Sequence, residues 1–124
     1  MKKLILLLLL MVSPNVMAKS IVSDKSSYDC VITGNDLAKH IVEYNKFDNG
    51  SEYNLSEVNA FMSYVLGVFD TSNNIFWCIY SSNINTAQVA KIVIKYINNN
   101  PEKLHLCAAT LVINALSEAF PCKK

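Results

Sequence analysis

The stretch NLSEVNAFMSYVLGVF, residues 54–69, decides the fold class of this 124-residue chain. Its apolar side chains recur every three or four residues, which is the period of one buried face of an α-helix. These side chains are Val58, Phe61, Met62, Val65 and Phe69. Asn54 stands at the expected N-cap, and Glu57 follows three residues later, where it would complete a capping box. The stretch therefore predicts a long amphipathic helix that begins at Asn54 and ends near Asp70.

Three other stretches have the same helical period, and they cover about residues 35–46, 85–97 and 101–120. Asn85 and Gln88 form a box-like start for the second of these. The third begins with a proline, which the first turn of a helix tolerates because no N–H is needed there. Connectors rich in Asn, Ser and Gly separate the stretches. We therefore predict an all-α fold, a small disulfide-stapled bundle of four main helices in an antiparallel or orthogonal arrangement.

The first eighteen residues indicate an export signal. Lys2 and Lys3 precede an apolar run over residues 4–12. The sequence Val-Met-Ala at residues 16–18 then places small residues three and one positions before a cut after Ala18. Nine apolar residues span only about 14 Å as a helix, against roughly 30 Å for the apolar core of a bilayer. We expect cleavage after Ala18, no membrane anchor, and one mature domain of residues 19–124 in the periplasm.

The charge balance narrows the class of partner. Without the two lysines of the signal, nine lysines face ten acidic residues, and there is no arginine. Such a chain lacks both the basic stripe that nucleic acid requires and a polybasic membrane patch. It also lacks a glycine-rich phosphate loop and a glycine-flanked nucleophilic serine. We therefore expect no cofactor, no nucleic acid and no enzymatic activity, and a protein or a small molecule as partner.

The cysteines indicate covalent cross-links in an oxidising compartment. Their even number behind a signal peptide predicts two disulfides. They are Cys30, Cys78, Cys107 and Cys122. A metal site would combine Cys30 and Cys107 with His40 and His105, but the intervals between these residues fit no common zinc motif. If the fourth helix is continuous, Cys107 and Cys122 lie about 22 Å apart and cannot be joined, which leaves two pairings open.

Two further features have alternative explanations at this stage. Ser63 and Gly67 put two small residues on one helix face, which favours a close approach of another backbone inside the fold over a subunit interface. The connector before the third helix carries Phe76, Trp77 and Tyr80. These aromatics either hold the connector onto the core or serve as anchors in protein recognition.

Several fragments resemble one family in their order and spacing. SYVLGVFD, residues 63–70, is similar to the GY[IV]xGVxD segment of the Rap/Tai immunity proteins, where Tai stands for type VI amidase immunity. WCI at residues 77–79 resembles the aromatic-Cys-Ile step that precedes a Thr-x-x-Gln helix start in that family, here NTAQ at residues 85–88. Further short matches follow in the family's order, namely KYI (95–97), NPE (100–102), LH (104–105), AA (108–109), LV (111–112), AL (115–116) and AFPC (119–122). The resemblance covers about residues 35–122.

The chain departs from the family pattern at a few positions. Many members have glycine in place of Ser63, proline in place of Tyr80 and a further cysteine near Phe61. Thr86 and Gln88 are only two residues apart, and the connector before them is a residue longer.

The resemblance implies a periplasmic, all-helical and often dimeric protein that neutralises a peptidoglycan amidase delivered by type VI secretion. Inhibition in this family is steric, because an element of the immunity protein occupies the papain-like Cys/His groove of the amidase. The family pattern also implies a disulfide between Cys78 and Cys122, which leaves Cys30 to pair with Cys107. An acid-stress chaperone of the periplasm is the alternative, because such proteins are also small, helical and disulfide-bonded.

The long connector after the second helix supplies the candidate plug for the amidase groove. Its short polar residues suit a narrow cleft, and the neighbouring disulfide would order it before binding. The candidates for partner binding are Asp70, Ser72, Asn73 and Asn74. The turn over residues 48–53, with Asp48 and Glu52, would add contacts from the other chain of a homodimer.

Overall fold

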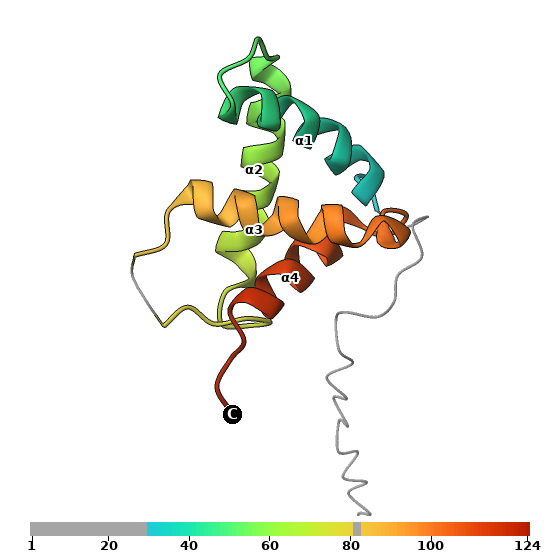
Figure 1. The fold of residues 1–124 in the computed structure, drawn as a ribbon. Coiled ribbons are helices and arrows are strands. Elements are labelled where there is room, and N and C mark those ends of the chain that lie inside the picture. Colours follow the sequence, from blue (N-terminus) through green and yellow to red (C-terminus); the bar gives the residue numbers. More distant parts are fainter. Residues whose placement is uncertain (1–29, 81–82) are drawn as a thin grey trace, which may run out of the picture.

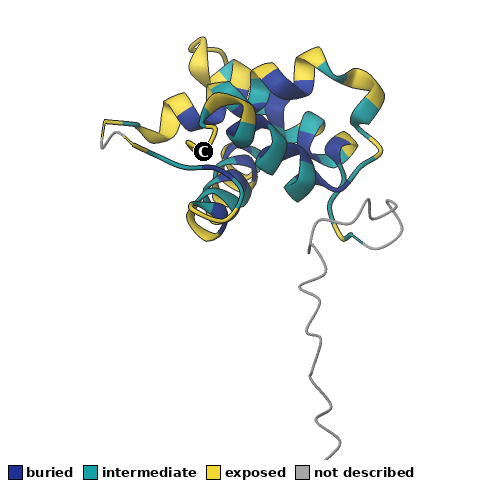
Figure 2. Ribbon diagram, turned by 90° about the horizontal axis from the view of Figure 1, so that it is seen from below, coloured by how far each residue is buried: buried dark blue, intermediate teal, exposed yellow. Residues whose placement is uncertain are grey.

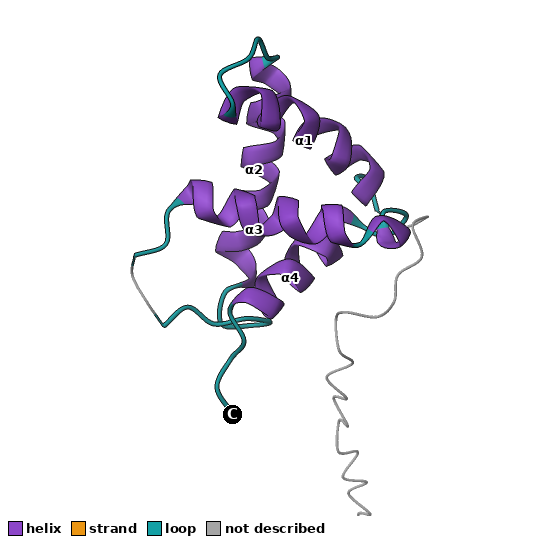
Figure 3. Cartoon of the chain, viewed as in Figure 1, coloured by secondary structure: helices purple, strands orange, loops and turns teal. Residues whose placement is uncertain are grey.

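A computed structural model describes residues 30–80 and 83–124. It contains four α-helices, α1 (Gly34–Asp48), α2 (Leu55–Ser72), α3 (Thr86–Asn99) and α4 (Ala108–Ala119), and one short 3-10 helix, η2 (Pro101–Lys103). Within these residues there is no β-strand, which confirms the all-α prediction (Figure 3). The predicted signal peptide and its cleavage site at Ala18 lie outside the described residues.

The helices form two pairs that cross each other. α1 and α2 are joined by a short turn and lie against each other, while α3 passes across α2 and packs on α4 (Figure 1). The α1–α2 turn lies at one end of the molecule. The connector after α2 and the C-terminal tail lie together at the opposite end.

A single apolar core fills the space between the helices (Figure 2). Its largest fully buried side chains come from all four helices and from the connector after α2. They are Trp77, Phe61, Leu37, Leu111, Leu116, Val65, Val89, Val93 and Val112. Burial of each large apolar side chain contributes roughly 1.5–3 kcal/mol, so this core is the main source of stability.

The helix starts follow the capping rules, with one difference. α3 begins with the expected capping box of Asn85 and Gln88. α1 begins at Gly34 behind a second, unpredicted capping box, formed by Thr33 and Asp36. Both boxes satisfy N–H groups that the first turn of a helix leaves free.

Asn54 caps α2 as predicted, because its side-chain oxygen accepts from the N–H groups of Ser56 and Glu57. The carboxylate of Glu57 does not reach back to Asn54, so the predicted capping box is wrong there. Glu57 instead contacts Nδ1 of His40 on α1. Glu43, also on α1, accepts the Asn54 N–H at 2.8 Å in its place. The start of α2 is therefore completed by side chains from its neighbour.

The prediction of one continuous fourth helix is wrong. After η2 the chain turns, and α4 begins only at Ala108. The carbonyl oxygens of Leu104 and Leu106 accept the N–H groups of Asn35 and Gly34, each at 2.9 Å. These two N–H groups lie in the first turn of α1 and have no partner within their own helix. Residues 104–107 are therefore used to complete the start of α1.

α2 extends further than predicted and ends at Ser72. The hydroxyl groups of Thr71 and Ser72 donate to the carbonyl oxygens of Gly67 and Val68, at 2.8 and 2.6 Å. Such bonds to the preceding turn satisfy carbonyl and hydroxyl groups at a helix end. The connector that follows is therefore shorter than the sequence suggested.

The outer face of α2 includes two small residues. Ser63 and Gly67 are both exposed. A Cβ atom on Gly67 would meet no heavy atom within 4 Å, once the backbone of its own helix is left aside. The predicted close approach of another backbone inside the fold is therefore wrong.

Two disulfides link both ends of α4 to other parts of the chain. Cys30 pairs with Cys107 and Cys78 pairs with Cys122, with Cα–Cα distances of 5.6 and 4.8 Å. This is the pairing that the family resemblance implied. None of the helices within the described residues is both long and apolar enough to cross a bilayer.

Candidate partner-binding site

The chain leaves α2 through a tight loop, residues 73–77, which we call the tip loop. It is closed on itself by backbone hydrogen bonds. The Asn74 N–H donates to the Trp77 carbonyl at 2.7 Å, and the N–H groups of Ile75 and Phe76 donate to the Ser72 carbonyl at 3.2 Å. The tip loop is therefore a fixed turn at the end of a helix.

Trp77 holds the tip loop onto the core. It has no exposed surface, and its ring lies 4.7 Å from that of Phe69 and 5.9 Å from that of Phe120, measured between centroids. Its indole Nε1 donates to the Ser72 hydroxyl at 2.7 Å. For Trp77, the interpretation of the connector aromatics as anchors to the core is correct.

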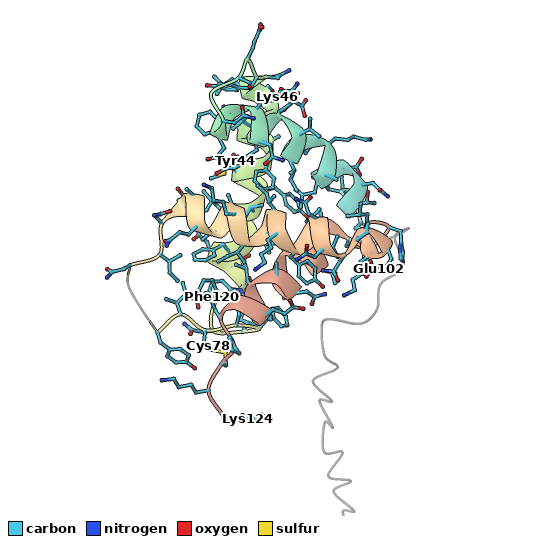
Figure 4. The ribbon with its side chains drawn as sticks, in the orientation of Figure 1. Tyr44, Lys46, Cys78, Glu102, Phe120 and Lys124 are labelled. Carbon is cyan, nitrogen blue, oxygen red and sulfur yellow. A yellow bond between two sulfur atoms is a disulfide. The ribbon has the colours of Figure 1, made fainter. Side chains whose placement is uncertain are left out.

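α4 and the C-terminal tail hold the tip loop from the other side. The Ser117 hydroxyl donates to the Phe76 carbonyl at 3.1 Å, and the Cys78 N–H donates to the Phe120 carbonyl at 2.9 Å. The Cys78–Cys122 disulfide follows directly, and Figure 4 shows Cys78 beside Phe120 at this end of the molecule. The exposed ring of Tyr80 is also engaged, because its hydroxyl accepts the N–H of Lys123 at 2.7 Å.

The four candidate plug residues have different environments. Asp70 is exposed on the last turn of α2 and forms no ion pair with a described residue. Asn74 is exposed, with a positive φ of 61°. Ser72 is only 4% exposed, and its hydroxyl is bonded to Trp77. Asn73 is half-buried, and its Oδ1 atom is buried without a hydrogen-bond partner among the described residues. Asp70 and Asn74 are therefore the two that face solvent.

Ile75 of the tip loop is exposed, which its sequence context does not predict. It is 66% exposed, although Phe76 and Trp77 beside it point inward. An isoleucine next to two aromatic residues is ordinarily assigned to the core. The only sequence feature that could have indicated exposure is the position of Ile75 directly after a polar run.

The second group of candidates lies at the other end of α2, in the α1–α2 turn. Asp48 pairs with Lys91 of α3 at 3.3 Å, and Glu52 is exposed. Gly50 has a φ of 76°, which glycine adopts without strain. An α2 of 18 residues is about 27 Å long, so one chain does not place this turn and the tip loop in one small site.

Two ionisable groups near this turn have shifted pKa values. The hydrogen bond from the Lys46 ammonium and, to a smaller extent, that from the Asn54 N–H lower the pKa of Glu43 from its usual 4.5. Burial raises the pKa of Tyr44 above 10.0, and the charge of Asp48 adds to the effect. Both shifts favour the charge states that these groups already have at neutral pH, a charged Glu43 and a neutral Tyr44, and both arise from structural contacts of the turn.

No group of three or more His, Cys, Asp or Glu side chains within the described residues gathers as metal ligands. All four cysteines are in disulfides, His40 contacts Glu57, and His105 is exposed. A surface hollow of about 280 Å³ lies between α3 and α4, and one of about 480 Å³ lies beside the α1–α2 turn. Neither is lined by a histidine, a serine or a cysteine.

The family model of the Rap1a immunity proteins matches residues 33–122. No curated protein sequence matches the chain. The matched part begins at the N-cap of α1 and ends at the cysteine that holds the tip loop, so it includes all four helices and the candidate site. The chain therefore belongs to the family of Rap1a immunity proteins.

Proposed function

We propose that this protein is a periplasmic immunity protein that binds a peptidoglycan amidase of a type VI secretion system and blocks its active-site groove. The family indicates an immunity protein against a secreted effector, and therefore an inhibitor and a protein partner. The tip loop is the observation that carries the finer proposal, because it is a turn closed by backbone hydrogen bonds with exposed polar side chains on and beside it.

Rigidity favours inhibition because a loop that is already ordered loses little conformational entropy on binding. Three backbone hydrogen bonds close the tip loop, and the buried ring of Trp77 fixes its base. The Cys78–Cys122 disulfide prevents the loop from leaving the end of α4. The loop would therefore enter a groove in the conformation that it already has.

The exposed polar groups of this end suit a Cys/His groove. The carboxylate of Asp70 is uncompensated by any described cation, so it is available to an imidazolium or to a backbone N–H of the amidase. Asn74 adds a carboxamide that both donates and accepts. We place these two side chains within an interface of standard size, about 800 Å² on each partner.

Export to the periplasm is the remaining part of the proposal. It is supported by two disulfides in a small domain, which are typical of oxidising compartments. The signal-like residues 1–18 would supply the route. The target, a cell-wall amidase, acts in the same compartment.

The test uses the product of the gene immediately upstream, which we expect to be a small amidase. The double variant Asp70→Lys with Asn74→Gly reverses one charge and removes one amide, and glycine keeps the positive φ at residue 74 without strain. We expect binding to weaken at least tenfold, or about 1.4 kcal/mol, in calorimetry at neutral pH.

Two further charge reversals complete the test, one as a matched control and one as a separate test of the α1–α2 turn. Glu102→Lys lies on η2, away from the tip loop and the α1–α2 turn, and should leave affinity unchanged (Figure 4). Glu52→Lys tests the α1–α2 turn alone, and a loss there would indicate contacts from the other chain of a dimer. If the wild-type protein neither binds nor inhibits the amidase, the proposed function is wrong.

A further inference from the structure

The tip loop displays one large apolar side chain, that of Ile75. Single exposed apolar residues are common on protein surfaces and by themselves need no explanation. Ile75 differs because hydrogen bonds hold its own backbone and the two residues that follow it. Its own N–H is bonded to the Ser72 carbonyl, and the following two residues are anchored in the fold.

The backbone conformation that displays Ile75 has a cost. Asn74 precedes it with a φ of 61°, in the left-handed region that residues other than glycine seldom adopt. Asparagine tolerates this region better than most residues, but the conformation persists only where the surroundings impose it. The closed loop imposes it here, and the result is an isoleucine that points outward beside two aromatic residues that point inward.

Several other large apolar side chains are exposed within the described residues, and Val31 is the most exposed of them at 99%. Two residues with about the same exposure as Ile75 are displayed differently. Leu55 is 60% exposed, but it is the first residue of α2, where a helix end simply meets solvent. Tyr80 is 60% exposed, but its hydroxyl and ring both contact Lys123. Ile75 combines high exposure, a fixed backbone and the absence of an internal role. Leu55 has nearly the same exposure and size, and so it is the matched control.

We propose that Ile75 is the apolar anchor of the inhibitory interface and enters an apolar pocket beside the polar groove of the effector. This inference rests on the proposed function and assigns the single side chain that contributes most to affinity at that site. Anchors of this kind are buried at the centre of an interface and are surrounded by polar residues that exclude water. Asp70 and Asn74 are exposed near the same end of α2 and would form part of that polar rim.

The test compares Ile75→Ser with Leu55→Ser in binding to the purified product of the upstream gene. We expect Ile75→Ser to weaken binding roughly 10- to 100-fold, the value of one buried isoleucine side chain. Most of the loss should appear as faster dissociation. Leu55→Ser should change affinity less than about twofold, and Ile75→Val should keep most of the affinity because it retains the apolar branch.

Trp77 is the sole tryptophan of the chain, so its fluorescence reports directly on the tip loop. Ile75→Ser should leave its emission and the thermal midpoint unchanged, because the side chain is exposed. If the wild type binds and Asp70→Lys weakens binding while Ile75→Ser does not, the anchor is wrong and the proposed function stands. If Ile75→Ser and Leu55→Ser weaken binding equally, the anchor is also wrong. If the wild type does not bind, the proposed function itself fails.

Discussion

The two ends of α4 are each held by a disulfide, yet they are built for different purposes. Cys107, the N-cap residue directly before α4, is joined to Cys30, and we call the surrounding residues 30–36 and 104–108 the N-terminal junction. Beyond its last residue, Cys122 is joined to Cys78, and residues 76–80 with 117–123 form the C-terminal junction. The contacts of the N-terminal junction hold the fold together, whereas those of the C-terminal junction support an exposed loop.

The N-terminal junction has no spare space. A Cβ atom on Gly34 would lie 2.4 Å from Cδ1 of Leu111 and 2.8 Å from the carbonyl oxygen of Leu104. Cys107 is only 8% exposed. Backbone hydrogen bonds run in both directions, since Ala108 N–H donates to the Ile32 carbonyl at 2.9 Å. The close packing is that of the backbone, and the exposed side chains around it, those of Val31, Asn35 and His105, belong neither to the tip loop nor to the α1–α2 turn.

The C-terminal junction satisfies its backbone groups but keeps side chains free. Cys122 is exposed, and the tip loop next to it presents Asn74 and Ile75 to solvent. The buried part of the junction is concentrated in one residue, Trp77. The same covalent device therefore closes a packed seam at one end of α4 and supports a projecting loop at the other.

The largest expected effect comes from removing each disulfide in turn by paired Cys→Ser substitution. Each loss should destabilise the domain by about 2–5 kcal/mol. The two bridges span sequence separations of 77 and 44 residues. The chain-entropy model then makes the Cys30–Cys107 loss the greater by about 0.5 kcal/mol. Denaturant unfolding measures both.

Effector binding sharpens the comparison. Under conditions where both variants remain folded, loss of Cys78–Cys122 should weaken binding, because the tip loop loses one of its supports. Loss of Cys30–Cys107 should leave affinity unchanged. Equal losses of affinity in the two variants would contradict the view that the N-terminal junction is structural and that only the C-terminal junction supports the binding loop.

A pair of glycine substitutions gives the next largest effect. Gly34→Ala should destabilise by about 1–3 kcal/mol, since two of the three nearest atoms belong to the backbone of Leu104 and cannot move freely. Gly67→Ala is the control inside α2, where no atom would meet the new methyl group. It should stabilise the protein by about 0.5–1 kcal/mol, because alanine loses less conformational entropy in a helix. Opposite signs are therefore expected in thermal unfolding.

Much of the fold could be predicted because it depends on local sequence. The apolar periodicity located the four helices, and Asn85 with Gln88 fixed the start of α3. The family pattern supplied the pairing of the cysteines. In each case the deciding residues lie close together in the chain or belong to a shared motif.

The remaining features depend on partners far away in the sequence. Residues 104–107 continue an apolar helical pattern, but their carbonyl groups are required by α1, some 70 residues earlier. Glu57 has the spacing of a capping residue, but His40 attracts its carboxylate. Ile75 has an apolar side chain and aromatic neighbours, as a core residue would, and only the closed loop turns it outward. Sequence periodicity contains no record of these long-range contacts.

The smallest expected effect is a change in pH dependence at the N-terminal junction. The Thr33 N–H and hydroxyl donate to the Asp36 carboxylate at 3.0 and 2.8 Å. These bonds favour the charged form and hold the pKa of Asp36 below its usual 3.8. A lowered pKa in the folded state means that the carboxylate stabilises the fold above pH 3.8 and that this contribution is lost as the pH falls through the folded value.

Asp36→Asn removes this titration while it keeps an oxygen that can accept from Thr33. The wild type should therefore be more stable than the variant at neutral pH, and the difference between their thermal midpoints should shrink as the pH falls below 3.8. The other carboxylates titrate in both proteins and cancel in this difference. Effector affinity at neutral pH should be the same for both, because the capping box of α1 lies in the junction that holds the fold. A constant difference in midpoint across the acidic range would show that the charge of Asp36 has no part in closing this end of α4.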